Sequence, residues 1–107
     1  MSDAFHEREN TFEKQFVNEE TLRFRAVARR NRALALWVAD LKGMSGEAAE
    51  KYAEAFVAAR VGDSDDNVAA GLQEELARGN VDLSDHRMQR RMEEEMARAL
   101  ASVKAGR

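Results

Sequence analysis

The chain has 107 residues, of which 35% are charged, with a formal net charge of −3 and neither proline nor cysteine. This length suits one domain, and the lack of cysteine excludes disulfides, thiolate metal sites and a cysteine nucleophile. The acidic balance argues against a nucleic-acid binder, which usually carries a strongly basic face, and the Ala-, Glu- and Arg-rich composition predicts an all-α fold.

The sequence contains no candidate for a membrane span or a secretory signal. The longest apolar run, residues 33–39, has seven residues, whereas a bilayer span needs about 20. The first ten residues lack the cationic start and apolar centre of a signal peptide. We therefore expect a cytoplasmic protein.

Residues 1–18 form a charged opening segment with three phenylalanines. At about 100° per residue, Phe5, Phe12 and Phe16 fall within an arc of about 40° on a helical wheel. Burying them would contribute about 1.5–3 kcal/mol each, while each ordered residue costs about 1–2 kcal/mol of backbone entropy. The segment is therefore expected to be mobile or conditionally helical: it either extends the first helix with support from the bundle, or it waits for a partner's surface.

Residues 19–42 are predicted to form the first and central helix, with Asn18 as its N-cap and Gly43 as its stop. Apolar residues recur at spacings of three and four, which is typical of a buried helix face. Asn31 lies on this face, where we expect a hydrogen-bonded core position, with a ligand role as the alternative. The expected core positions are Phe24, Val27, Asn31, Leu34, Val38 and Leu41.

Three further helices are predicted. They cover residues 46–61 after Ser45, a shorter stretch that begins at residue 63 or 64 and ends before Gly79, and residues 85–104 after Ser84. Short connections favour antiparallel neighbours. The expected architecture is a four-helix bundle domain of residues 19–107, preceded by the segment of residues 1–18. The core positions expected on these helices are Ala48, Ala49, Tyr52, Phe56, Ala59, Val68, Leu72, Leu76, Met88, Met92, Met96, Ala99, Leu100 and Val103.

The sequence offers no convincing catalytic or metal site. Ser84, Asp85 and His86 are adjacent, so on a helix they point about 100° apart and cannot form a catalytic triad. The glutamates of the second and fourth helices lack the Glu-x-x-His pairs of di-metal bundles. His6, the other histidine, is expected to be exposed, with pH-dependent partner binding as an alternative. We therefore expect no catalytic residue, no metal and no enzyme activity.

Cationic residues mark one face of the first helix. Arg25, Arg29 and Arg32 lie opposite its apolar face, and Leu36 continues that line. They form either a solvated face, a docking surface or an anion site that could bind an adenine nucleotide weakly. Arg23 and Arg30, nearer the edge, are expected to pair with acids of the third helix.

Several motifs together resemble the zeta-subunit family, the alphaproteobacterial inhibitors of the F-type ATP synthase. The motifs include the phenylalanine pattern of the opening segment, Leu22-x-Phe24, the run Ala28-Arg29-Arg30-Asn31 leading to Leu36-Trp37, Tyr52, and the stretch from Val81 through Ser84-Asp85-His86-Arg87 to Arg91-Met92. The resemblance covers nearly the whole chain.

The resemblance implies a four-helix bundle whose N-terminal segment becomes helical on entering a catalytic interface of the synthase head. The partner would be the head's alternating large subunits and its central stalk, and a monomeric inhibitor would be peripheral to the inner membrane through the synthase. The alternative is a helical adaptor or weak nucleotide-binding module that uses the basic face. The resemblance assigns partner binding to Phe5, Arg8, Glu9, Phe12, Glu13, Lys14 and Phe16.

Overall fold

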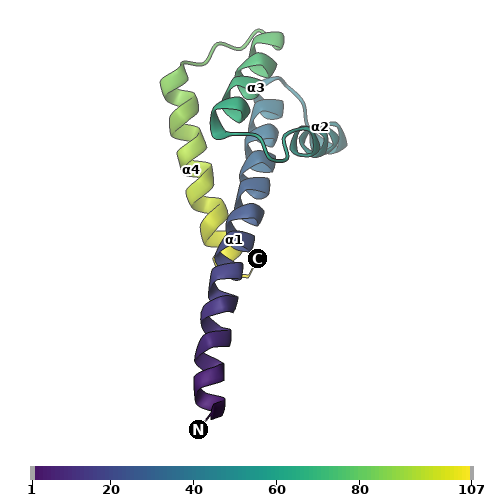
Figure 1. The fold of residues 1–107 in the computed structure, drawn as a ribbon. Helices are drawn as coiled ribbons and strands as arrows, with labels where there is room; N and C mark the ends of the chain where they lie inside the picture. Colours follow the sequence, from purple (N-terminus) through teal and green to yellow (C-terminus); the bar gives the residue numbers. More distant parts are fainter. Residues whose placement is uncertain (1, 107) are drawn as a thin grey trace.

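The computed structural model describes the backbone of residues 2–106 and the side chains of residues 19–106. Within that range the elements are α1 (Ser2–Leu41), α2 (Gly46–Ala59), α3 (Asp65–Arg78) and α4 (Asp85–Lys104) (Figure 1). Residues 2–106 contain no strand. The prediction of an all-α four-helix bundle is therefore confirmed.

Helix α1 is the central element of the bundle. It packs against α2, α3 and α4, and α3 also packs against α4. In Figure 1, α4 runs alongside α1, whereas α2 and α3 gather near the C-terminal end of α1. The helix begins at Ser2, so the predicted N-cap at Asn18 is wrong and no helix boundary separates residues 2–18 from residues 19–41.

Each of the four helices is followed, two or three positions beyond its last residue, by a residue with left-handed backbone conformation. Gly43 has φ of 84°, and behind it the Met44 amide donates to the Ala39 carbonyl at 2.8 Å. This six-residue closure is a Schellman motif, which satisfies carbonyls that the helix end leaves free. At the end of α3 the left-handed residue is Asn80, with φ of 57°, one residue beyond the stop predicted at Gly79.

Serine precedes each of the three shorter helices, as predicted for Ser45 and Ser84, whereas α3 begins at Asp65, one or two residues later than expected. Ser64 and Ser84 accept hydrogen bonds from the backbone amides of Asn67 and Arg87, each at 3.2 Å. These bonds satisfy amides that have no partner inside the helix. Ser45 occupies the N-cap position of α2, but its side chain makes no capping hydrogen bond.

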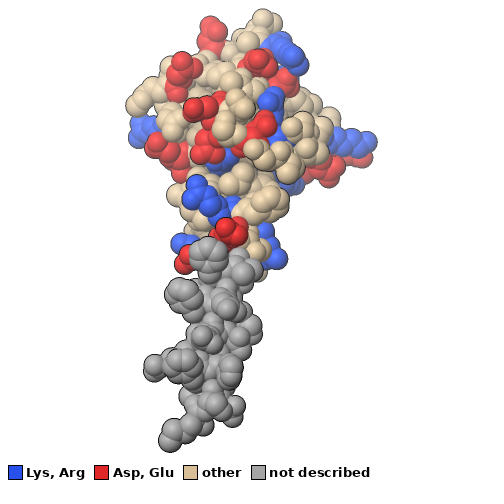
Figure 2. Space-filling view, viewed as in Figure 1, with Lys and Arg blue, Asp and Glu red and all other residues tan. Residues whose placement is uncertain are grey.

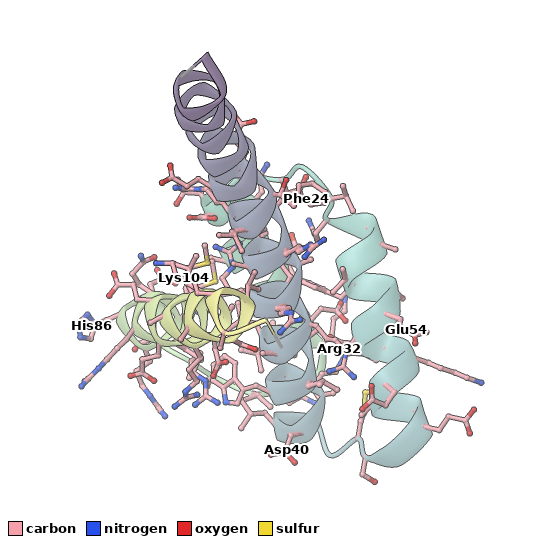
Figure 3. The ribbon with its side chains drawn as sticks, turned by 90° about the horizontal axis from the view of Figure 1, so that it is seen from below. Phe24, Arg32, Asp40, Glu54, His86 and Lys104 are labelled. Atoms are coloured by element: carbon pink, nitrogen blue, oxygen red, sulfur yellow. The ribbon has the colours of Figure 1, made fainter. Side chains whose placement is uncertain are left out.

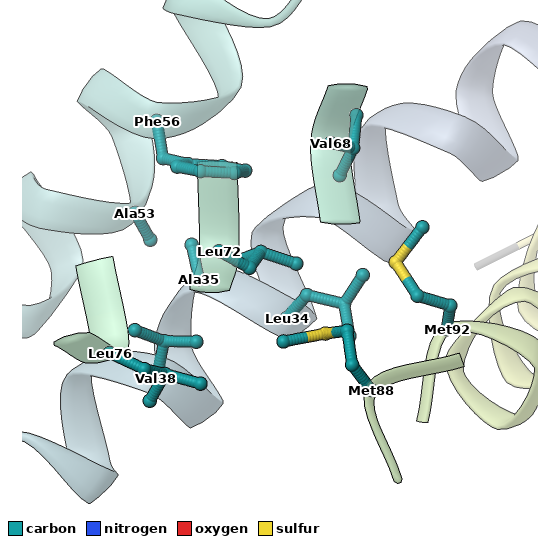
Figure 4. Close-up of a cluster of buried hydrophobic side chains, with 10 residues drawn as sticks. All are labelled: Leu34, Ala35, Val38, Ala53, Phe56, Val68, Leu72, Leu76, Met88 and Met92. Carbon is teal, nitrogen blue, oxygen red and sulfur yellow. The ribbon is translucent and has the colours of Figure 1, made fainter. Parts of the chain in front are cut away.

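The main hydrophobic core lies where α1 meets the other three helices (Figure 4). Met88 and Met92 carry the contribution of α4, as the spacing of its methionines predicted. A second, smaller cluster joins Ala26 of α1 to Ala99 and Val103 of α4. The main cluster comprises Leu34, Ala35, Val38, Ala53, Phe56, Val68, Leu72, Leu76, Met88 and Met92.

Some of the expected core positions are exposed. Phe24 is 66% exposed and Leu41 is 40% exposed, although both fit the apolar spacing of α1. The physical reason is position. Leu41 is the last residue of α1, and Phe24 lies beside the end of α2, so both residues lie at the edge of the contact between helices. Ala48 and Ala59 of α2 are exposed as well.

Candidate partner-binding surfaces

The seven residues assigned to partner binding by resemblance lie outside the described side chains. They are Phe5, Arg8, Glu9, Phe12, Glu13, Lys14 and Phe16, and His6 falls in the same stretch. Their place in the chain is the N-terminal part of α1. The assignment of these residues therefore stays a prediction.

The predicted basic face of α1 is divided between two neighbouring helices. Arg29 Nη1 donates to Ser102 Oγ of α4 at 2.7 Å, and Arg32 forms an ion pair with Glu50 of α2. Figure 3 shows Arg32 on the side of α1 that faces α2. Leu36 is half-buried and packs against the main core. Arg25, Arg29 and Arg32 are all exposed, so the three arginines stay on the surface although two of them contact a neighbouring helix.

A buried polar network fixes the neighbouring face of α1. Arg30 is 2% exposed and Asn31 is 3% exposed. The Arg30 guanidinium donates to Asn31 Oδ1 from Nε at 3.2 Å and from Nη2 at 3.0 Å, while its Nη1 lies 2.7 Å from Asp65 Oδ1 of α3. The prediction that Asn31 is a hydrogen-bonded core residue is confirmed, and so is the pairing of Arg30 with an acid of the third helix. Such pairing is required because an unpaired buried charge is costly.

A second polar cluster joins α2, α3 and the residue that follows α1. Tyr52 donates its hydroxyl to Glu75 Oε1 at 2.6 Å, and Lys42 Nζ lies 3.5 Å from the same oxygen and 4.8 Å from the Tyr52 ring centroid. Arg78 Nη1 donates to the other oxygen at 3.0 Å. This cluster could not be predicted from the sequence, because the four residues come from three separate segments.

The pKa values of two groups in this cluster are shifted. Burial and the hydrogen bond to Glu75 raise the pKa of Tyr52 well above its usual range. The Tyr52 hydroxyl, followed by Lys42 and Arg78, lowers the pKa of Glu75 despite the opposing effect of burial. Both shifts keep a neutral phenol beside a charged carboxylate, which is a strong hydrogen-bonding combination.

An apolar groove lies between α1 and the end of α2. It has a volume of about 130 Å³, and the exposed side chains of Phe24 and Val61 lie on it. Val61 is 66% exposed, as is Phe24. This groove could not be predicted from the sequence, because the apolar spacing of α1 placed Phe24 in the core. The lining residues are Phe24, Val27, Ala28, Asn31, Val57, Arg60, Val61 and Gly62.

Arg60 forms the charged wall of this groove and is held on three sides. Its Nη1 lies 3.3 Å from Asp63 Oδ2, and its guanidinium carbon lies 5.4 Å from the Phe56 ring centroid. The guanidinium also approaches Gly71 so closely that a Cβ at that position would lie 2.5 Å from Nη2. The wall therefore depends on a glycine in the middle of α3.

Two further hollows occur on the bundle. One, of about 260 Å³, lies beside Trp37 and is lined by Arg87, Arg90 and Arg91, and the Arg91 guanidinium carbon lies 4.9 Å from the Trp37 ring centroid. The other, of about 560 Å³, lies between α3 and α4 and has an acidic rim. On the face shown in Figure 2, acidic and basic side chains are interspersed, so no single charge dominates it.

The described part of the chain shows neither a metal cluster nor a membrane-spanning helix. Residues 19–106 contain no group of three His, Cys, Asp or Glu side chains placed to hold a metal ion. Ser84 is committed to capping α4, and His86 is exposed. Among the described helices, none combines the length and the apolar character that crossing a membrane requires.

Among known protein families, one family model matches nearly the whole chain. Residues 1–102 match the family model described as ATPase inhibitor subunit zeta. No curated protein and no solved structure gives a significant match. The matched range includes the N-terminal segment and the four helices, apart from the last two residues of α4.

Proposed function

Because the chain belongs to the ATPase inhibitor subunit zeta family, we propose that it blocks ATP hydrolysis by the F-type ATP synthase through residues 1–18. The segment enters a catalytic interface of the synthase head, between the large alternating subunits and the central stalk. Rotation in the hydrolytic direction is then blocked, and rotation in the synthetic direction expels the segment. The protein acts as a monomer without enzyme activity, peripheral to the inner membrane on its cytoplasmic side through the synthase.

The set of residues that form the core is the observation that supports separate roles for residues 1–18 and for the bundle. All buried hydrophobic residues among residues 19–106 lie between Ala26 and Val103. The core of the described bundle is thus built from residues 26–103. The family match also includes residues 1–18, which the proposal assigns to the partner.

The phenylalanines supply the driving force in this proposal. Burial of Phe5, Phe12 and Phe16 against the head contributes about 1.5–3 kcal/mol each. The charges of Arg8 and Lys14, together with the glutamates of the segment, set the register and discriminate against other partners. This is the usual arrangement of an amphipathic helix bound in a groove.

The alternative, an adaptor or nucleotide module on the basic face, receives less support. Arg29 and Arg32 already bind Ser102 and Glu50 within the bundle. A ligand would have to compete with these contacts. We therefore retain inhibition through residues 1–18 as the proposed function.

The test uses purified synthase head and the full-length chain. Wild-type protein should abolish ATP hydrolysis, and the triple variant Phe5→Ser, Phe12→Ser, Phe16→Ser should not. The matched control is Leu41→Ser, because Leu41 is an exposed apolar residue of α1 beyond the segment. Circular dichroism should give the same thermal midpoint for wild type and the triple variant. Equal inhibition by the wild type and the triple variant would refute the role of the stripe.

A further inference from the structure

The largest of the three hollows described above lies between α3 and α4, and its floor is apolar. Met88 of α4 and the small side chains of Ala69, Ala70 and Ala77 of α3 line it. Its volume is about 560 Å³, and the side chains of residues 19–106 leave this space open. Since α3 and α4 form its two sides, we refer to it as the α3–α4 groove.

Carboxylates stand on both sides of the α3–α4 groove. Asp66 and Glu74 belong to α3, and Asp85 belongs to α4. All three are exposed, and none takes part in the ion pairs formed within residues 19–106. None of the lining residues in this described part of the chain is basic. The charge that lines the groove is therefore entirely negative.

The basic residues nearest in sequence do not neutralise these carboxylates. Arg87 and Arg90 of α4 line the separate hollow beside Trp37. Arg78 of α3 forms its ion pair with Glu75, which does not line the groove. The negative charge of the groove therefore remains available to a partner.

Helix dipoles account for only part of this charge. Asp66 and Asp85 lie in the first turns of α3 and α4, where a carboxylate stabilises a helix. Glu74 lies in the middle of α3, so the dipole does not account for its position. Carboxylates on both sides of an apolar floor are complementary to an apolar surface flanked by lysine or arginine.

The dimensions of the groove suit a helix. Its lining extends along α3 from Asp66 to Ala77, which at about 1.5 Å per residue is about 17 Å, or three helical turns. The alanine side chains end at Cβ, so a second helix can approach α3 closely. Met88 adds a flexible apolar side chain that adapts to the shape of its partner.

We propose that the α3–α4 groove binds an amphipathic helix of the ATP synthase whose apolar stripe is flanked by lysine or arginine. This inference rests on the proposed function, which makes the synthase the partner. Residues 1–18 supply the block, and the groove increases the affinity of the complex, because the second of two linked contacts is intramolecular. The chain's own N-terminal segment does not suit the groove, since residues 1–18 contain four acidic and two basic residues.

The test measures binding of full-length variants to purified ATP synthase, together with inhibition of ATP hydrolysis. Glu74→Lys reverses a charge in the groove, and Ala70→Leu fills its floor. Each should raise the Kd about tenfold, while inhibition at saturation stays complete. The matched controls are Glu54→Lys and Ala58→Leu, because both positions are exposed on α2 and lie outside the groove. Controls should change the Kd less than twofold, and all four thermal midpoints should stay close to wild type.

A second measurement separates the groove from the inhibitory segment. The triple variant Phe5→Ser, Phe12→Ser, Phe16→Ser should still bind the synthase weakly, although it does not inhibit. Adding Glu74→Lys should remove this remaining binding. The Kd of the wild type should also rise more steeply with salt than that of Glu74→Lys, because salt screens the attraction between the carboxylates and the basic helix.

The failure of the inference and the failure of the proposed function are distinguishable. If wild type inhibits and both groove variants bind like their controls, the inference fails and the proposed function stands. If the triple variant inhibits as well as wild type while Glu74→Lys weakens binding, the role of residues 1–18 fails and the groove remains a docking site. If wild type does not bind the synthase, both fail. If sedimentation shows a wild-type dimer that Glu74→Lys converts to a monomer, the occupant is a second copy and the inference is overturned.

Discussion

The hydroxyl of Tyr52 should contribute measurably to stability through its hydrogen bond with Glu75. Tyr52→Phe removes only this hydroxyl and keeps the ring beneath Lys42. A hydrogen bond to a charged group contributes about 1.5–3 kcal/mol. Because Lys42 and Arg78 still contact the carboxylate, we expect the lower part of this range, a loss of about 2 kcal/mol at pH 7.

The loss should depend on pH in a defined direction. The folded-state pKa of Glu75 is lowered, chiefly by the Tyr52 hydroxyl. Its contribution is thus fully present above the unfolded pKa of about 4.3 and disappears as the pH falls through the lower folded value. The pKa of Tyr52 is raised, so its contribution is present below about pH 10 and disappears as the pH rises through the folded value. The difference between wild type and variant should be largest near neutral pH.

Urea denaturation at pH 3 and pH 7 measures this difference. Glu75→Gln provides the partner for a double-mutant cycle, because the amide keeps an acceptor oxygen but loses the charge. We expect a coupling of at least about 1 kcal/mol between the two positions at pH 7. A Tyr52→Phe loss below about 0.5 kcal/mol at pH 7, or a loss of equal size at both pH values, would refute the argument.

Three smaller predictions test other contacts. Asn80→Ala should destabilise the protein by about 1 kcal/mol because alanine tolerates left-handed backbone poorly, whereas Asn80→Gly should not; thermal unfolding would contradict this if both variants matched wild type. Asp65→Asn should cost about 1 kcal/mol more than Asp66→Asn, because both residues are in the first turn of α3 but only the first pairs with a buried arginine; equal denaturation midpoints would contradict it. Gly71→Ala should stabilise α3 by about 1 kcal/mol in an Arg60→Ala background and by less in wild type, where the new Cβ displaces the guanidinium; equal gains in the two backgrounds would show that the close approach has no cost.

The helices of the bundle could be predicted from the sequence because their signals are local. Serine before each short helix and glycine after α1 mark boundaries through backbone chemistry that neighbours in sequence decide. The methionine spacing of α4 likewise identified Met88 and Met92 as core residues. One local signal misled: Asn18 is a suitable N-cap residue by type, but α1 continues through that position.

The surfaces of the bundle were less predictable, because burial depends on which helix faces each residue. Phe24 has the spacing of a core residue, yet it is 66% exposed beside the end of α2. Arg29 and Arg32 have the spacing of a solvated face, yet they bind side chains of α4 and α2. Periodicity identifies the sides of a helix but not the length of its neighbours. The groove and the Tyr52 cluster each combine residues from distant parts of the chain, which periodicity does not detect.

The central position of α1 has a mechanical consequence. A force applied along the axis of α1 is shared by its contacts with α2, α3 and α4, which bear the load together. To slide through the bundle, the helix would have to break the buried Arg30 pair and shift the core residues Leu34 and Val38 in a single step. Pulling α1 out therefore disrupts the core that all four helices share, and the force that the protein withstands is governed by the rate at which this core unfolds.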